Sequence, residues 1–193
     1  ESISYFTLQN TDLNDIVANI LSKKGVVAWF QGQSEWGPRA LGNRSILVDA
    51  KVPEIKEILN KKIKLREQFR PFAASVLEED ISNYFNVNEE GDAFPNMNFV
   101  LEAKEVTKNK YPAIVHIDGS SRIQSVNKTN NLKFYNLIST FKKKFKSPIL
   151  LNTSLNIDEP ICQSPDDVIK SFGNTKVDCI ALESILLIKK SIL

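Results

Sequence analysis

Apolar side chains recur along the chain with two different spacings. Two long segments carry them three or four residues apart, which predicts helices over residues 11–24 and 131–145. Shorter segments are continuously apolar, a pattern typical of buried strands. These strand candidates are residues 26–30, 46–48, 72–77, 148–151, 179–182 and 185–188. Gly25 is expected to end the first helix, because glycine readily takes the left-handed conformation found there.

The remaining segments are assigned from helix and turn signals. Pro53 suits the first position of a helix, and Ser164 followed by Pro165 and two aspartates predicts another. We expect a short helix over residues 78–84, a loop over 86–96, a turn over 104–110, strands over 97–103 and 113–117, and an extended segment over 123–126. Residues 1–10 carry no motif and are expected to be an edge strand or part of a linker.

Strands and helices mix without strict alternation, which predicts an α/β or α+β fold with a mixed sheet. The 193 residues fit a single domain over residues 1–193. A hydrophobic content of 42% and a charged content of 25% are ordinary for a globular protein. No apolar run approaches the length of a membrane span, and no signal peptide is visible, so we expect a cytoplasmic protein.

Net charge, cysteines and histidines bear on three further possibilities: a nucleic-acid partner, a redox motif and a metal site. The net charge of +2 argues neither for nor against a nucleic-acid partner. The lysine run 142–144 is interpreted as a solvated helix end, so no such partner is expected. Cys162 and Cys179 form no metal or redox motif. His116 is the only histidine, so no metal site built by the protein itself is predicted.

A glycine-rich loop between two strand candidates contains several residues that could bind a ligand. It runs from residue 31 to residue 45 with the sequence QGQSEWGPRALGNRS. Arg39 and Arg44 lie on it, and guanidinium groups suit phosphate or carboxylate recognition; two solvated arginines on a surface loop are an equal alternative. Gly37 and Gly42 have the spacing of a phosphate-binding P-loop. After its last glycine, that motif needs a lysine and then a serine or threonine. Here Asn43 and Arg44 follow Gly42, which excludes a Walker-type NTPase.

Two short polar pairs offer further cations and hydrogen-bonding groups. One is Lys64-x-Arg66 and the other is Ser154-x-Asn156. In an extended segment, residues two apart point to the same side, so each pair can present both side chains to one cavity. The alternatives are a solvated charge run near a helix end for the first pair and turn chemistry for the second.

Four blocks of unusual composition resemble the C-terminal domain of the O-carbamoyltransferases of the NodU and antibiotic-carbamoylation type. They are EWGPRALGNRSIL, NKKIKLREQFRPFAASV, HIDGSSRIQSV and LLNTSLNIDEPI, in the order of the family. Together they extend over nearly the whole chain. Some positions depart from the family pattern: RPFAAS stands for RPFAPS, NTSLN for NTSFN and Asp-Gly-Ser for Asp-Gly-Thr, and FPNMNF matches the SPxM element only loosely.

The resemblance implies the YrdC-like fold, a twisted open sheet of mixed strand direction with packed helices and a cationic cavity. It implies that the domain binds carbamoyl phosphate and ATP, with Mg²⁺ accompanying the nucleotide, and forms carbamoyl-adenylate. In the family, an N-terminal domain of actin-like fold then passes the carbamoyl group to a hydroxyl acceptor. Because the chain begins at Glu1 and its only methionine is Met97, we expect a fragment without that domain.

The resemblance also assigns roles to individual residues. Lys64, Arg66, Ser154 and Asn156 match the tetrad of YrdC-like enzymes that form carbamoyl-type adenylates. Arg39 and Arg122 match further arginines that contact the ligand. These assignments make the four cations Lys64, Arg66, Arg39 and Arg122 the expected catalytic residues.

Five more residues are candidates for the same site. Arg44 and Arg70 are possible additional anion ligands, and His116 is expected either to contact the ligand or to support a residue that does. Asp118 is expected to close a turn through its side chain, with Mg²⁺ binding as the alternative. Glu35 is expected to orient Arg39, because an acid inside a phosphate site would otherwise be repulsive; a direct ligand contact is the alternative.

Three alternatives to this function stay open from the sequence. A threonylcarbamoyl-adenylate synthase shares the tetrad but lacks the GPRALGNRS and HIDGSSR blocks. An RNA-binding module is possible because YrdC-like folds can bind RNA, and such binding would weaken steeply with salt. A non-catalytic nucleotide-binding domain is the third alternative.

Overall fold

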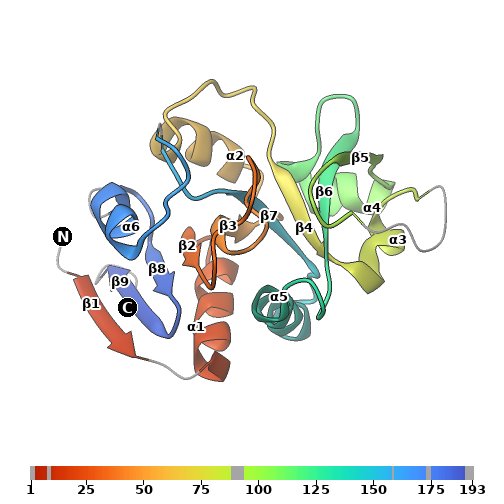
Figure 1. Cartoon of the computed structure of the whole chain (residues 1–193). Coiled ribbons are helices and arrows are strands. Elements are labelled where there is room, and N and C mark those ends of the chain that lie inside the picture. Colours follow the sequence, from red (N-terminus) through yellow and green to blue (C-terminus); the bar gives the residue numbers. More distant parts are fainter. Residues whose placement is uncertain (1–2, 8–9, 88–93, 158, 173–174, 190–193) are drawn as a thin grey trace.

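The structure is a computed structural model, and it describes residues 3–7, 10–87, 94–157, 159–172 and 175–189. Within these ranges, nine strands form one sheet (Figure 1). In spatial order they are β1 (Ile3–Thr7), β9 (Ile185–Lys189), β8 (Cys179–Leu182), β2 (Val27–Phe30), β3 (Arg44–Asp49), β7 (Ile149–Ser154), β4 (Ala73–Leu77), β6 (Ser120–Val126) and β5 (Phe99–Glu102). Two neighbouring pairs, β2 with β8 and β4 with β6, are parallel and the others are antiparallel, which confirms the predicted mixed sheet.

Helices cover both faces of the sheet. The α-helices are α1 (Asn10–Ser22), α2 (Ile55–Ile58), α3 (Ile81–Tyr84), α4 (Glu105–Lys110), α5 (Leu132–Phe145) and α6 (Pro165–Phe172). A π-helix, η1 (Leu59–Ile63), continues α2, and two short 3₁₀ helices are η2 (Glu78–Asp80) and η3 (Pro112–Ile114). None of the helices in the described ranges is long and apolar enough to cross a membrane.

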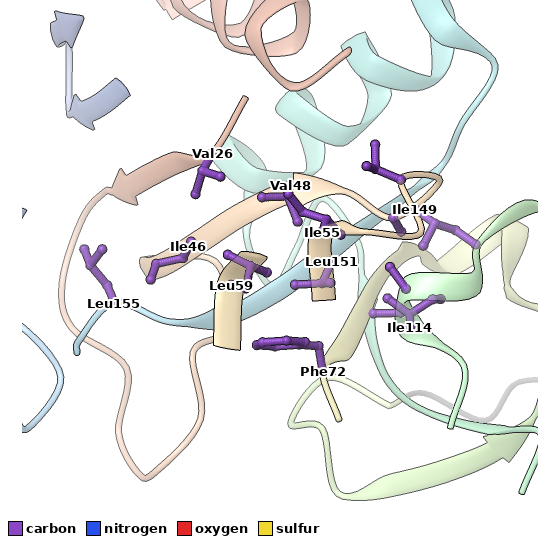
Figure 2. Close-up of a cluster of buried hydrophobic side chains, with 14 of the residues drawn as sticks. Val26, Ile46, Val48, Ile55, Leu59, Phe72, Ile114, Ile149, Leu151 and Leu155 are labelled. Carbon is purple, nitrogen blue, oxygen red and sulfur yellow. The ribbon is translucent and has the colours of Figure 1, made fainter. Parts of the chain in front are cut away.

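Alternating residues of the central strands build two cores. On one face, Val27 and Trp29 pack with α1 and α5, which lie side by side in Figure 1. On the other face, Ala28 and Phe30 belong to the cluster that includes Ile55 and the residues drawn in Figure 2. Full burial of one Val, Leu, Ile or Phe side chain in these cores stabilises the fold by about 1.5–3 kcal/mol. The two cores fix the ends of the strands next to the polar motifs, such as the end of β7 at Ser154.

Several predicted elements are confirmed with their caps. Asn131 caps α5 by accepting a hydrogen bond from the backbone N–H of Phe134 at 3.0 Å. Ser164 and Asp167 cap α6 reciprocally, because each side chain accepts from the backbone N–H of the other, at 3.2 and 2.8 Å. The first residues supply an edge strand, β1, which pairs with β9.

Two predictions for the segment before β6 were wrong. Residues 104–110 were expected to be a turn, but they contain α4, whose first turn carries Glu105 in an ion pair with Lys108. Residues 113–117 were expected to be a strand, but Pro112 starts a 3₁₀ helix and β6 begins only at Ser120. A short apolar run is buried in either conformation, so its pattern does not decide between them. Of the predicted loop over 86–96, residues 88–93 lie outside the described residues.

The end of α1 also differs from the prediction. Lys24, not Gly25, takes the left-handed conformation, with φ of 68°. The backbone N–H of Gly25 donates to the carbonyl of Ile20 at 3.0 Å, which completes a Schellman motif one residue earlier than expected. A Cβ atom at Gly25 would lie 2.5 Å from Cγ2 of Ile20. Glycine is therefore needed here for close approach and not for positive φ.

Candidate functional site

One carboxylate holds the glycine loop between β2 and β3 in place. Glu35 Oε1 accepts backbone N–H bonds from Leu41, Asn43 and Arg44 at 2.8, 2.7 and 3.0 Å. In the described part of the chain, Glu35 forms no ion pair with Arg39. The expectation that Glu35 orients Arg39 directly is therefore replaced by an indirect role. It fixes the backbone of the loop that carries the arginine.

Gly42 allows this loop to lie directly on α5. Its φ is +103°, and a Cβ atom at this position would lie 2.2 Å from the ring of Phe134. Its carbonyl accepts a hydrogen bond from Trp29 Nε1 at 2.9 Å. Gly37 has a similar φ of +108°, but a Cβ atom there would meet nothing within 4 Å, so its role is conformational only.

Lys64 meets both members of the Ser-x-Asn pair. Its side chain is buried, and Nζ lies 3.2 Å from Ser154 Oγ and 2.8 Å from Asn156 Oδ1. Nζ also donates to the carbonyls of Ser154 and Asn156 at 2.5 and 2.8 Å. Burial lowers the pKa of Lys64 to about 7, and the neighbouring Arg66 adds to this effect. The structure thus brings three of the four tetrad residues into direct contact.

The backbone geometry behind this contact differs from the extended segments expected. Lys64 follows the π-helix with helical dihedral angles, and Leu65 has a left-handed φ of 48°. Ser154 is the last residue of β7, and the N–H of Asn156 turns back to its carbonyl at 3.0 Å. The pairs therefore converge through two turns. A π-helix inside a helix often marks a functional site, which fits its position beside Lys64.

Arg66, the fourth tetrad residue, is held by Asn60. Its Nε donates to Asn60 Oδ1 at 2.8 Å, and its guanidinium carbon lies 4.8 Å from the centre of the Phe72 ring. Asn60 is fully buried, and its Nδ2 donates to the carbonyls of Gln68 and Arg70, each at 3.1 Å. Asn60 thereby fixes both the arginine and the turn that follows it.

Arg39, Arg66 and Arg122 line one small pocket together with Ser154. The pocket has a volume of about 80 Å³, and its walls are formed by Pro38, Arg39, Ala40, Arg66, Pro71, Phe72, Ala73, Met97, Arg122, Asn152, Thr153 and Ser154. None of these lining residues is acidic. Three guanidinium groups without a carboxylate between them suit an anion. The volume suits one small anionic group, since pockets for drug-sized ligands measure about 300–1,000 Å³.

Burial and mutual repulsion act on two of these arginines. The pKa of Arg122 is lowered first by burial and then by the charges of Arg39 and Arg66. The pKa of Arg66 is lowered first by burial and then by Arg70. Arg122 Nε is buried and has no hydrogen-bond partner among the described residues. A bound anion would relieve the repulsion and give this donor a partner.

Arg44 is not part of the pocket. Its guanidinium carbon lies 3.5 Å from the centre of the Phe30 ring. Its nitrogens donate to the carbonyls of Gln31, Asn43 and Gln163 at 3.0, 3.1 and 3.4 Å. The side chain is buried, and burial is the first cause of its lowered pKa. Arg44 therefore fastens the glycine loop to the core, in place of the anion contact expected for it.

Arg70 lies outside the pocket as well. Its side chain is 54% exposed, and its Nε forms an ion pair with Glu67 at 3.1 Å. It is not among the lining residues, although it is close enough to Arg66 to affect its pKa. The structure therefore gives Arg70 a surface position beside the site.

His116 and Asp118 form the turn that leads into β6. Asp118 Oδ1 accepts from the backbone N–H and the hydroxyl of Ser120 at 2.9 and 2.6 Å, and these bonds lower the pKa of the carboxyl group. His116 Nδ1 lies 3.2 Å from the same hydroxyl, and burial lowers the pKa of the ring. Gly119, between Asp118 and Ser120, has φ of 81°. Neither side chain lines the pocket, so both support the strand that carries Arg122.

Sequence reasoning missed the polar residues beneath the site. Asn152 lines the pocket, and it is hydrogen-bonded to Ser75 and Gln124 on neighbouring strands. Asn60 was equally unnoticed. Each of these residues directly follows an apolar run in its segment, and an asparagine at such a position is the signal that would have found them. A polar side chain in a buried strand needs partners, and those partners define a network.

Residues 18–189 match the family model described as Carbamoyltransferase C-terminus. The chain belongs to this carbamoyltransferase family. Nodulation protein NolO of Bradyrhizobium diazoefficiens is 42% identical over 183 residues, which are 94% of this chain and 33% of that protein. Nodulation protein U of Sinorhizobium fredii is 41% identical over 140 residues, which are 72% of this chain and 24% of that protein. The chain thus spans about a third or less of these two relatives.

Solved structures show the fold of this carbamoyltransferase domain. Full-length HypF in the phosphate- and nucleotide-bound form has a TM-score of 0.62 and 19% identity, with 94% of this chain and 22% of that chain covered. Sua5 of P. abyssi complexed with L-threonine has a TM-score of 0.62 and 16% identity, with 89% and 46% covered. The predicted YrdC-like fold is confirmed. At these identities the likeness concerns the fold alone.

Proposed function

We propose that this carbamoyltransferase domain binds ATP and carbamoyl phosphate and forms carbamoyl-adenylate. The observation that carries the proposal is the convergence of Arg39, Arg66 and Arg122 on a pocket with no acidic side chain among the described residues of its walls. Positive groups fixed in advance around transferring phosphoryl oxygens are the main contribution a protein makes to such chemistry. The nucleotide-bound form of the structural neighbour HypF supports a nucleotide as ligand.

The proposed reaction has two steps, hydrolysis of carbamoyl phosphate and adenylation of the carbamate. Water releases phosphate from carbamoyl phosphate and leaves carbamate. A carbamate oxygen then attacks the α-phosphorus of ATP, the bond from that phosphorus to its bridging oxygen breaks, and pyrophosphate leaves with the electron pair. Negative charge develops on the phosphoryl oxygens and on pyrophosphate, where the guanidinium groups of Arg39, Arg66 and Arg122 would neutralise it.

Lys64 is proposed to organise the remaining hydrogen-bonding groups. It holds Ser154 and Asn156 in fixed positions through its Nζ, and Ser154 lines the pocket beside the arginines. Its lowered pKa lets it take up a proton when an anion arrives, because the negative charge favours the ammonium form. Lys64 would therefore become charged when the anion binds, whereas the arginines of the pocket are always charged.

Mg²⁺ is proposed to arrive with the nucleotide. Within the described ranges, no group of three or more His, Cys, Asp or Glu side chains is placed to hold a metal. Asp118 already accepts two hydrogen bonds from Ser120. Magnesium is commonly bound through substrate phosphates and retained waters, so the triphosphate would supply most of its ligands.

Transfer to a hydroxyl acceptor is proposed to take place in another part of the longer protein. The relatives NolO and nodulation protein U extend far beyond the region matched here. An N-terminal domain of actin-like fold is the proposed partner that receives the adenylate. The cytoplasm, which supplies ATP, is the proposed location, and neither a membrane nor a nucleic acid is required.

Titration calorimetry with ATP tests the binding part of the proposal. We expect saturable binding to the 193-residue chain, competed by pyrophosphate and reduced at least about tenfold by Arg122→Ala, because several charge-assisted hydrogen bonds are lost. Arg70→Ala is the matched control, since its side chain lies outside the pocket, and it should keep the affinity. If ATP does not bind, or if the two variants lose affinity equally, the arginine pocket is not the nucleotide site.

A further inference from the structure

Asn60 is hydrogen-bonded, through its backbone and its side chain, to the segment that carries Arg66. It lies in the π-helix η1, and its side chain is fully buried. Its carbonyl accepts from the backbone N–H of Arg66 at 2.9 Å, and its Oδ1 accepts from Arg66 Nε at 2.8 Å. Its Nδ2 donates to the carbonyls of Gln68 and Arg70, each at 3.1 Å. The oxygen and both N–H donors of the amide are thus engaged inside the protein.

The two backbone carbonyls fix which way the Asn60 amide faces. A carbonyl can only accept hydrogen bonds, so the N–H₂ group must point to Gln68 and Arg70. The amide oxygen then points to Arg66 Nε, which can only donate. A flipped amide would place oxygen against oxygen on one side and N–H against N–H on the other. The turn after η1 therefore presents a fixed acceptor to Arg66.

The bond to Asn60 decides which edge of the Arg66 guanidinium is free. A guanidinium can hold two oxygens of an anion either through Nε and one terminal nitrogen or through its two terminal nitrogens. At Arg66 the Nε–H is already donated to Asn60, so the terminal edge is left. The guanidinium carbon lies 4.8 Å from the centre of the Phe72 ring, which restricts the group further. Because Arg66 lines the pocket, the terminal edge is what it can offer to an anion there.

Arg122, in the wall of the same pocket, is held differently. Its Nε is buried and has no hydrogen-bond partner among the described residues. No side chain in the described part of the chain therefore does for Arg122 what Asn60 does for Arg66. The fixed Nε–H of Arg66 is thus a feature of one arginine and not a general property of the pocket.

We propose that Asn60 is a positioning residue that restricts Arg66 to binding a phosphoryl group through its two terminal nitrogens. The inference rests on the proposed function, in which Arg66 neutralises charge on phosphoryl oxygens. The bond to Nε holds the guanidinium in place before the anion arrives, so less conformational freedom is lost on binding. Asn60 acts through Arg66, because its own side chain is buried and does not line the pocket.

Calorimetric titration of the chain with inorganic pyrophosphate tests this role through a cycle of two replacements. Asn60→Ala is expected to weaken binding about tenfold, because a freely rotating guanidinium must then be ordered by the anion. In the Arg66→Met background, the same replacement of Asn60 should have no further effect. A merely structural role would weaken binding by the same factor in both backgrounds. Asn127→Ala is the matched control and should keep the affinity, since Asn127 is hydrogen-bonded to Glu78 and does not line the pocket.

NMR of the isotope-labelled wild type decides the matter even where Asn60→Ala does not fold. The Nε–H signal of Arg66, identified by its loss in Arg66→Met, should exchange slowly with water in the free protein. It should change little when pyrophosphate binds, because the anion contacts the terminal nitrogens. The Nε–H of Arg70, on a side chain that is 54% exposed, should exchange quickly. Equal exchange rates for the two signals would overturn the inference.

The outcomes separate this inference from the proposed function. If pyrophosphate binds the wild type and Asn60→Ala weakens binding equally in both backgrounds, the role of Asn60 is overturned and the anion pocket stands. A loss confined to the background that contains Arg66 supports the role. If pyrophosphate does not bind the wild type, the proposed function fails and this inference fails with it.

Discussion

Lys64 Nζ donates to the backbone carbonyl of Ser154 at 2.5 Å, although 90 positions separate the two residues in the sequence. The contact joins the end of the π-helix to the end of β7. It therefore depends on the tertiary fold and not on residues that are close in the sequence. The site and the fold are coupled through this one ammonium group.

Replacement of Lys64 should reveal this coupling as a loss of stability. Lys64→Met keeps the length of the side chain but leaves the oxygens of Ser154 and Asn156 without their donor. We expect the free energy of unfolding at pH 10, where the buried lysine is neutral, to fall by about 1–3 kcal/mol, the cost of unsatisfied buried acceptors. Urea unfolding measures it, with the exposed Lys62→Met as control.

The wild type and Lys64→Met should also differ in their response to pH. Burial lowers the pKa of Lys64 to about 7, whereas an unfolded lysine titrates near 10.4. Between these values the unfolded chain holds a proton that the folded chain has released. The free energy of unfolding of the wild type, relative to Lys64→Met, should therefore rise with pH from about 7 toward 10, by up to about 1.4 kcal/mol per pH unit. Parallel stability curves for the two proteins would show that the pKa of Lys64 is not lowered.

Arg39→Lys tests the guanidinium geometry of the pocket. A guanidinium binds a phosphate with two parallel hydrogen bonds, and an ammonium of equal charge cannot. We expect the affinity for ATP to weaken by about 1–3 kcal/mol. Arg70→Lys, on the exposed ion pair with Glu67, should leave it unchanged. Equal affinities for Arg39→Lys and the wild type, measured by calorimetry, would return Arg39 to a solvated surface role.

The sequence anticipated the elements that have strong local signals. Proline and aspartates at the start of α6, and the helical spacing of α5, need no tertiary information. The 3₁₀ helix at Pro112–Ile114 was missed because buried apolar residues look alike in a strand and in a helical turn. The difference lies in tertiary packing, which a local pattern does not contain.

For the site, the sequence indicated the charged residues but not which of them line the pocket and which are buried elsewhere. Arg39 and Arg44 looked equivalent on one loop, yet Arg39 lines the pocket and Arg44 is buried against Phe30. The distinction depends on β3, which begins at Arg44 and turns its side chain to the core. The Asn152 amide is held by the carbonyl of Ala40, a contact between distant segments. Neither relationship has a local signature.

Two glycines of the loop offer a matched test of its packing on α5. Gly37 and Gly42 have nearly the same positive φ, so an alanine at either position carries a similar backbone strain of about 1–2 kcal/mol. At Gly42 the added methyl group would also meet the ring of Phe134 at 2.2 Å. We expect Gly42→Ala to cost about 1–3 kcal/mol more than Gly37→Ala in thermal or urea unfolding. Equal losses would mean that the loop does not rest on α5.

Release of pyrophosphate is the direct measure of carbamoyl-adenylate formation by this domain. The chain is incubated with ATP, Mg²⁺ and carbamoyl phosphate, and pyrophosphate is followed by a coupled assay. We expect release that requires carbamoyl phosphate and is abolished by Arg122→Ala, while Arg70→Ala keeps it. Release that instead requires L-threonine and bicarbonate would contradict the account and assign the domain to threonylcarbamoyl-adenylate synthesis.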